Sequence, residues 1–371
     1  MLLHNLGGTI RTRVPSETLE ITKPYIEKAG ISRIANITGL DCLNIPVYTC
    51  YRPNSKNLST SQGKGLTDEL ALCSAIMEAI EHYYAENIKI DCESSFNKLS
   101  AQCAVDPNQL MLGFTKLKNI HEYVLNWRKA KNLFDNSMLL IPTDYINLDL
   151  TSVKLETGIF IRSTTGLASG NTREEAILHA LFEIFERNCL FEFKKLRIRE
   201  KQSLLLDINT VNDKYVAQLM DKLVEKNITV AIFDITNRFD IPTYHCIISD
   251  NSPIRKLGHQ SGTGTHLSKN IALCRAITEA AQSRLTHISG ARDDMFPMNY
   301  QYEWKNLGTA GVVNYQCRSS IETSNTPLDK QINYLLNIFN NNGYDKLVCV
   351  DHTSNDESIA VVHVVVLGLN T

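Results

Sequence analysis

The sequence has no long apolar run and no strong excess of charge of either sign. Its 371 residues contain 38 Lys and Arg against 40 Asp and Glu, which gives a formal net charge of −2. A balance this even gives no electrostatic reason to expect nucleic acid or an anionic membrane as the main partner. No stretch is apolar enough for a signal peptide or a spanning helix, so we expect a cytoplasmic protein without membrane association.

Several catalytic and metal-binding motifs are also missing. The ten cysteines form no Cys-x-x-Cys pair and no Cys/His pairing with zinc-finger spacing, so we interpret most of them as buried structural thiols. No Gly-x₄-Gly-Lys-Ser/Thr is present, and GTGTHL (262–267) lacks the third glycine of a dinucleotide fingerprint. Ser169 is not centred as in a nucleophile elbow. These absences argue against a Walker-type ATPase, a Rossmann dehydrogenase and a serine hydrolase.

Three helical stretches share one template, and a glycine-bearing loop precedes each. In every copy two alanines flank a variable residue, and two acidic or amide residues follow at fixed spacing. The copies are Ala71, Ser74, Ala75, Glu78 and Glu81; Ala176, His179, Ala180, Glu183 and Glu186; and Ala272, Arg275, Ala276, Glu279 and Gln282. A strand–turn–strand pattern also recurs, at 34–48, 231–248 and 348–366. The first two of these precede a loop and helix, and the third closes the chain.

The repeats predict a mixed α/β (α+β) fold with pseudo-threefold character. Copies about a hundred residues apart are too distant for a solenoid, so we expect one domain over residues 1–371. Its repeated units would be strand–turn–strand and glycine loop–helix. Residues 92–155 fall between the first two helices, and we predict that they form an inserted or peripheral element.

The acidic residues of the first helix gather on one alanine-rich face. At about 100° per residue, Ser74, Glu78 and Glu81 share one arc of the helix. No Lys or Arg occurs from residue 65 to residue 88. The second helix also places its two glutamates beside alanines, with Arg173 and Arg187 as its only nearby cations. A solvated acidic face is the better interpretation of one such helix, but two of them favour a cation site. Unpaired buried carboxylates cost several kcal/mol each, and hard oxygen ligands suit Mg²⁺, with a pair of metal ions as one arrangement.

The third helix has a different charge. Arg275 stands where the other helices have Ser74 and His179, Gln282 replaces the second acid, and Arg284 follows. Arginine makes bidentate contacts with phosphate, and glycine loops at helix N-termini offer backbone donors for the same purpose. Lys64, between two glycines, is a second phosphate candidate. This part of the site is predicted to bind an anion.

Residues 61–83, 165–188 and 262–285 together resemble the YcaO family, and the resemblance covers most of the chain. It implies the YcaO-type fold, with ATP and Mg²⁺ as cofactors. Position by position, it places the magnesium-binding glutamates on Glu78, Glu81, Glu183 and Glu186. It places the nucleotide contacts on Ser61, Lys64, Ser74, Arg275, Glu279, Gln282 and Arg284. It assigns no side chain to covalent catalysis, and no catalytic cysteine is required.

The resemblance implies ATP-dependent activation of a peptide backbone amide by O-phosphorylation, as in the modification of ribosomal peptides. We expect a thioamide product with an external sulfur donor, because residues 30–65 look most like TfuA-associated members and no proline follows Pro327. An azoline-forming cyclodehydratase acting on Cys, Ser or Thr is the alternative, and a non-catalytic nucleotide-binding partner is a third. No further leader-binding domain is visible, so we expect a TfuA-type or other partner to recruit the peptide or protein substrate. A homodimer is an open alternative.

Overall fold

The computed structural model describes residues 3–99, 103–113, 118–151, 158–250, 257–292, 294–295, 312–354 and 356–371. Parts of the predicted 92–155 element therefore lie outside the described residues. Within the described ranges, no helix combines the length and the apolar character needed to cross a membrane.

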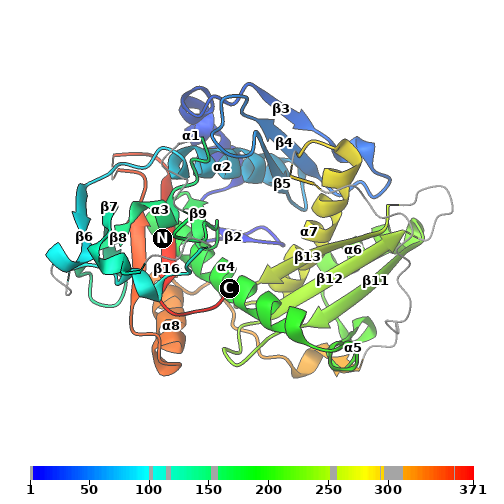
Figure 1. The fold of residues 1–371 in the computed structure, drawn as a ribbon. Coiled ribbons are helices and arrows are strands. Elements are labelled where there is room, and N and C mark those ends of the chain that lie inside the picture. The colour runs from blue at the N-terminus through cyan, green and yellow to red at the C-terminus, as the bar shows by residue number, and fades with distance from the viewer. Residues whose placement is uncertain are drawn as a thin grey trace.

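The first unit is a three-stranded antiparallel sheet followed by a helix (Figure 1). Strands β3 (Arg33–Asn36), β4 (Val47–Tyr51) and β5 (Thr60–Lys64) pair in that order. Helix α2 (Asp68–Ala85) then packs on β4 and β5. Its N-terminus is capped by the residue before it, Thr67, whose side chain accepts a hydrogen bond from a backbone N–H of the first turn.

The second unit repeats this order. Strands β11 (Ile228–Asp234), β12 (Thr243–Asp250) and β13 (His259–Thr265) form an antiparallel sheet, and α7 (Lys269–Ser289) packs on β12 and β13. Helix α6 (Lys214–Glu225) packs against both β11 and α7. The apolar side chains of these elements form one buried cluster beneath α7.

The third unit is assembled from two distant parts of the chain. Strands β15 (Leu347–Asp351) and β16 (Ala360–Val366) come from the C-terminal region, but the strand that completes the sheet is β9 (Leu167–Gly170). Helix α4 (Arg173–Lys195) follows β9 and packs on β9 and β16. The third strand pair, which the sequence leaves without a helix, therefore takes the helix from the middle of the chain. The predicted mixed fold with threefold repeated units is confirmed.

The sheet of the third unit continues beyond its three strands. Strand β7 (Val124–Asn132) pairs with β15, and β6 (Cys92–Ser95) and β8 (Met138–Pro142) pair with β7. Trp127 of β7 is fully buried in a cluster shared with β15 and β16. The described part of the 92–155 segment thus lies at one end of this sheet. Its status as an inserted element stays a prediction.

The remaining elements surround this framework. The helices are α1 (Pro15–Lys28), α3 (Thr143–Ile146), α5 (Ile198–Gln202) and α8 (Leu328–Asn341), and the strands are β1 (His4–Asn5), β2 (Ile10–Arg11), β10 (Leu206–Asp207) and β14 (Val313–Asn314). Short 3₁₀ helices are η1 (Thr38–Leu40), η2 (Phe96–Lys98), η3 (Pro107–Gln109), η4 (Ile120–Glu122), η6 (Ile208–Thr210) and η7 (Tyr315–Cys317).

Glycines in the third strand of each unit let the following helix approach closely. A Cβ at Gly63 would lie 2.0 Å from the backbone N of Ala75, and one at Gly264 would lie 2.1 Å from the carbonyl oxygen of Ala272. In the third unit a Cβ at Gly170 would lie 2.6 Å from a helix backbone nitrogen. Atoms cannot approach to these distances, so the strand needs glycine. This contact explains why glycine before the helix and alanine within it recur together.

Each helix also touches the third strand of a neighbouring unit, so the three units close into a ring. Helix α2 packs against β9, α4 against β13 and α7 against β5. Two hydrogen bonds mark these contacts: the Nε2 of Gln282 donates to the Gln62 carbonyl oxygen at 2.9 Å, and the Oγ of Ser169 donates to the Met77 carbonyl oxygen at 3.4 Å. The three helices therefore surround one common space, which Figure 1 shows near the centre of the ribbon.

Arg284 ties the outer side of α7 to two other elements. Its Nε donates to Asp41 and its NH2 group donates to Asp250, both at 2.9 Å. The exposed fraction of all three side chains is at most 2%. A buried cation held by two carboxylates cannot be removed without leaving both acids uncompensated.

We predict that Arg284→Met lowers the free energy of unfolding by about 3–5 kcal/mol, the usual cost of leaving buried carboxylates unpaired. Urea unfolding monitored by circular dichroism measures this change. The control is Arg199→Met on exposed α5, which should change stability by less than about 0.5 kcal/mol. Unchanged unfolding together with weaker nucleotide binding would instead support the nucleotide contact that the family resemblance implies for Arg284.

Candidate nucleotide and metal site

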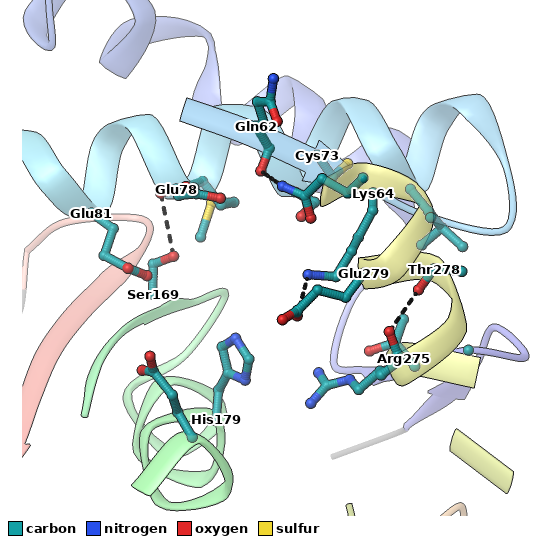
Figure 2. A pocket seen from close by; sticks show the side chains of 18 of the residues that line it. Gln62, Lys64, Cys73, Glu78, Glu81, Ser169, His179, Arg275, Thr278 and Glu279 are labelled. Atoms are coloured by element: carbon teal, nitrogen blue, oxygen red, sulfur yellow. Dashed lines mark hydrogen bonds and ion pairs between the residues drawn. The ribbon is translucent and has the colours of Figure 1, made fainter. Parts of the chain in front are cut away.

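A cavity of about 750 Å³ lies between α2, α4 and α7. The structure brings nine of the eleven predicted site residues to its wall: Lys64, Ser74, Glu78, Glu81, Glu183, Glu186, Arg275, Glu279 and Gln282. Figure 2 shows Lys64, Glu78, Glu81, Arg275 and Glu279 pointing toward one shared space from three different elements. Ser61 and Arg284 are the two that do not line the cavity.

Both exceptions follow from the periodicity of their elements. Side chains alternate along a strand, so Lys64 faces the cavity together with Thr60 and Gln62, while the buried Ser61 faces the other way. Arg284 follows Arg275 by nine residues, which is about half a turn around the helix after two full turns. Its guanidinium therefore points away from the cavity, toward its two carboxylate partners.

The repeated template arranges the wall of the cavity in layers. Successive template positions of one helix lie one turn apart along the cavity, because the template spacing is three or four residues. Equivalent positions of the three helices therefore form one layer. The first layer is Ser74, His179 and Arg275, the second is Glu78, Glu183 and Glu279, and the third is Glu81, Glu186 and Gln282. Two of the three units thus supply two acids each, and the unit of α7 supplies one acid with a cation and an amide.

Four of these carboxylates are held in surroundings that oppose ionisation. Burial raises the pKa of Glu78 to about 7 against the opposing effect of Lys64. Burial, and next the neighbouring Glu279, raise the pKa of Glu186 to about 8. The pKa of Glu81 is well above its ordinary value through burial and then through the charge of Glu183, whose own pKa burial also raises. At neutral pH these carboxylates must either hold protons or be neutralised by cations.

The second-layer acids are oriented by backbone N–H groups. The N–H of Gly166 donates to Glu183 at 3.3 Å, and the N–H of Thr263 donates to Glu279 at 3.4 Å. A backbone hydrogen bond from Gln62 likewise acts on Glu78. Each unit therefore fixes its middle glutamate with the strand or loop that precedes its own helix. Such fixed acceptors are suited to a ligand that must be held in one place.

The opposite side of the cavity is cationic. The Nζ of Lys64 forms an ion pair of 2.8 Å with Glu279 across two units. Burial opposes ionisation of Glu279, but this ion pair outweighs it, and the pKa of Glu279 lies below its ordinary value. Burial, and then the nearby Arg11, lower the pKa of Arg275 to about 10. Two neighbouring guanidinium groups in partly buried surroundings favour an anion between them.

His179 stands between these two sides as a neutral imidazole. Burial and then the charge of Arg275 hold its pKa well below its ordinary value. Its Nδ1 is buried and has no hydrogen-bond partner among the residues that the structure describes. Figure 2 shows the ring pointing into the cavity from α4. The side chain can therefore act as a polar contact without adding charge.

The acidic side fits Mg²⁺ in a specific way. Among the described residues, no three His, Cys, Asp or Glu side chains are placed to hold one metal ion between them. Mg²⁺ is usually held by one or two carboxylates, with water and phosphate oxygens completing its six ligands. The surplus of carboxylates with raised pKa fits that pattern, because α2 and α4 would each offer a pair to metal ions that also bind phosphate.

Some residues of the cavity wall are absent from the sequence-based assignment. His179 could have been found, since it occupies the template position of Ser74 and Arg275. Gln62 could have been found from strand alternation with Lys64. Arg11 gives no such signal, because it reaches the cavity only through the folding of residues far from the three repeats.

The chain is similar to known proteins over most of its length. A family model with the description "YcaO cyclodehydratase, ATP- and Mg²⁺-binding" matches residues 62–370. A Rhizobium leguminosarum bv. trifolii protein, named only for its place in the tfuA 3′ region, is 33% identical over 300 residues. That match covers 78% of this chain and 70% of the relative.

Two solved structures share the fold. A heterocyclase in complex with substrate and cofactor gives a TM-score of 0.77 at 19% identity, over 97% of this chain but only 53% of its own. The YcaO protein of Methanopyrus kandleri bound with AMPPCP and Mg²⁺ gives 0.74 at 19% identity, over 100% of this chain and 95% of its own. This chain thus spans about half of the heterocyclase. At this identity, both likenesses show the fold alone.

We predict that the metal-free protein loses stability at Glu186 as the pH rises. The pKa of this carboxyl is about 8 in the folded chain against an ordinary 4.5, so between these values the folded state holds a proton that the unfolded chain has released. The free energy of unfolding due to this group is complete below the lower value and falls toward the higher one. Glu186→Gln removes the slope, so its melting temperature should rise relative to wild type from about pH 5 to about pH 8.

Thermal melts in a chelator measure this difference. Buried histidines such as His82, whose pKa burial lowers to about 4, titrate with the opposite sign, but both proteins contain them. The difference between the two melting curves therefore reports Glu186 together with its interaction with Glu279 and Glu183. A difference that stays constant across the pH range would contradict the assignment.

Proposed function

The chain belongs to the YcaO family, and from that premise we propose that it uses ATP and Mg²⁺ to activate a backbone amide of a peptide or protein by O-phosphorylation. The observation that carries the proposal is the polarised cavity. Four glutamates with raised pKa line one side of it, while Lys64 and Arg275 line the other. A nucleotide polyphosphate brings negative charge for the cationic side, and its magnesium ions bring positive charge for the acidic side.

The chain's own residues would divide the work between the two sides. Glu78 and Glu81 of α2, with Glu183 and Glu186 of α4, would hold Mg²⁺. Lys64, Arg275 and Gln282 would contact the nucleotide from β5 and α7, since they reach the same cavity. Ser74, in the same layer as Arg275, and Glu279, in the next layer, would also contact the nucleotide. Placing reactants and screening charge in this way is the main requirement of phosphoryl transfer.

Phosphorylation explains why such a site would act on an amide. The amide oxygen is a poor leaving group, and ATP would supply the phosphoryl group that lets it leave once a nucleophile has added to the carbonyl carbon. The protein needs to bind both reactants, exclude water and stabilise the charge on the carbonyl oxygen. Among the described cysteines none need act as a nucleophile, and Cys50 of β4 and Cys73 of α2 have pKa values raised to about 12 by burial.

Two products are compatible with this activation. We infer a thioamide, with sulfur from an external donor, and the supporting observation is the relative in the tfuA 3′ region. An azoline, formed when a Cys, Ser or Thr of the peptide attacks, is the second candidate. It is supported by the structural likeness to a heterocyclase. The common step, ATP-dependent activation of the carbonyl, is the same for both.

A non-catalytic role as a nucleotide-binding partner fits the cavity less well. Buried carboxylates with raised pKa cost stability, and a scaffold gains nothing from placing two pairs of them on facing helices. The substrate would be a peptide or protein, and a TfuA-type or other partner would recruit it. These assignments rest on the family and on the tfuA-region relative.

We predict that Glu183→Gln and Glu186→Gln each lower magnesium-dependent ATP turnover by about 100-fold or more, because each removes a charged metal ligand at nearly constant volume. A phosphate-release assay measures turnover, and circular dichroism checks that the variants fold. Glu174→Gln is the matched control, since Glu174 is an exposed acid on the same helix. Normal turnover in both cavity variants would sink the metal assignment.

The mass of the product decides the reaction class. Exchange of a backbone oxygen for sulfur adds about 16 Da to the peptide, whereas cyclodehydration removes about 18 Da. We expect the gain when the protein is incubated with candidate partner, peptide, ATP and sulfide, and no change when sulfide is omitted. A loss of water at a Cys, Ser or Thr without sulfide would establish the azoline alternative and leave ATP-dependent activation intact.

A further inference from the structure

The segment formed by residues 4–13, here called the N-terminal segment, enters the cavity although it belongs to none of the three repeated units. Strands β1 and β2 pair as a hairpin within it, with His4 opposite Arg11. Leu6, Thr9, Arg11 and Arg13 all contribute to the cavity wall. Figure 1 shows β2 inside the ring that α2, α4 and α7 form. The segment therefore closes part of the cavity at the end where the helices begin.

The tip of the hairpin is fixed by close packing. Gly7 has a φ of +87°, a conformation that favours glycine. A Cβ there would lie 2.9 Å from the ring of Tyr215 on α6. Beside it, Gly8 approaches the side chain of Leu66, which follows β5. The tip thus rests on the first and second units.

The base of the segment is held by one buried carboxylate. Glu175, in the first turn of α4, has an exposed fraction of only 4%. One of its oxygens accepts hydrogen bonds from the backbone N–H of Thr12 at 2.9 Å and from the Thr12 hydroxyl at 2.6 Å. The side-chain amide of Asn171 donates to the other at 3.1 Å. Arg11 lies 3.7 Å from the same carboxylate.

This clasp fixes the residue before Thr12, Arg11, which is one of two arginines that the segment contributes to the cavity wall. Arg11 acts electrostatically on Arg275, His179 and His266, and in each case its charge lowers the neighbour's pKa. Arg11 therefore stands near a second guanidinium, that of Arg275, which repels its charge, and it forms an ion pair with Glu175. Two neighbouring guanidinium groups are stabilised when an anion joins them.

We propose that Glu175 is a positioning residue that clasps the N-terminal segment to α4 and so holds Arg11 beside Arg275, where the two contact the polyphosphate of the nucleotide. The segment would then supply a part of the site that the three repeated units do not contain. The identity of the anion rests on the proposed function, whereas the clasp rests on the hydrogen bonds of Glu175 alone.

Amide hydrogen exchange tests the clasp without any ligand. In Glu175→Gln only one of the two terminal atoms can accept, so the side chain cannot take the hydrogen bonds of Thr12 and of Asn171 together, and exchange at residues 9–13 should be about tenfold faster or more. Thr12→Val is the milder second variant, since it keeps the backbone N–H and removes only the hydroxyl. It should change exchange in the same direction by less. Glu174→Gln, one position earlier on an exposed site, should leave exchange unchanged.

Binding of AMPPCP with Mg²⁺, measured by calorimetry, tests the role of Arg11. Arg11→Met should raise the Kd about tenfold while leaving segment exchange near the wild-type rate, and Arg11→Lys should recover part of the loss. Glu175→Gln should raise the Kd as well. If Glu175 acts through Arg11, the double variant binds no more weakly than Arg11→Met alone, whereas two independent effects would multiply.

The outcomes separate the clasp from the function. Unchanged exchange in Glu175→Gln would overturn the clasp. Faster exchange with unchanged Kd, or multiplied effects in the double variant, would overturn the positioning of Arg11 through Glu175. A wild-type protein that fails to bind AMPPCP would overturn the proposed function and the nucleotide contact of Arg11, while the exchange result would still decide the clasp.

Discussion

The close contact between a glycine strand and an alanine helix sets the arrangement of the whole molecule. It recurs in each unit, at Gly63, Gly170 and Gly264, and it brings helix backbone within reach of strand backbone. A helix that lies this close to its own strand covers it with alanine and turns its longer polar side chains to the neighbouring side. Because every helix also touches the third strand of the next unit, those polar faces meet in one space. The cavity is therefore a consequence of backbone packing, and the side chains around it decide only its chemistry.

That chemistry arises because equivalent positions carry different residues. A ring with the same side chain at every copy would place like charges around one axis and could bind only one kind of ion. Here the first-layer position is Ser74, His179 or Arg275, so the unit of α7 gives the cavity a cationic side. Lys64 strengthens it from the first unit and pairs with Glu279 across the ring. The polarity of the site thus depends on departures from the repeat, while its shape depends on the repeat itself.

Much of this could be predicted from the sequence, and the limits have physical causes. The helix faces, the repeat and the glycine loops are local patterns, and nine of the eleven predicted site residues reach the cavity. Ser61 was assigned by resemblance, and Arg284 by its charge and by resemblance, although strand alternation and the helical angle place them on the opposite faces. The completion of the third sheet by β9 was not predicted, because it joins residues nearly two hundred positions apart and leaves no local pattern. Arg11 was missed for the same reason, since only the folded chain brings it to α4.

The buried carboxylates connect stability with binding. Glu81 and Glu186 have raised pKa values because of burial and then because of neighbouring carboxylates, Glu183 for Glu81 and Glu279 for Glu186, so this part of the fold works against ionisation. The free energy that folding loses there is recovered when a cation enters, since metal ions bind the deprotonated form and release the protons. Glu175 is the contrasting case, a buried acid whose oxygens are occupied by donors of the same chain. In helix α4, Glu175 thus stabilises the fold because its hydrogen-bond donors belong to the same chain. A few residues along, Glu183 and Glu186 have raised pKa values although Glu183 pairs with Arg187, and a cation ligand can neutralise their charge.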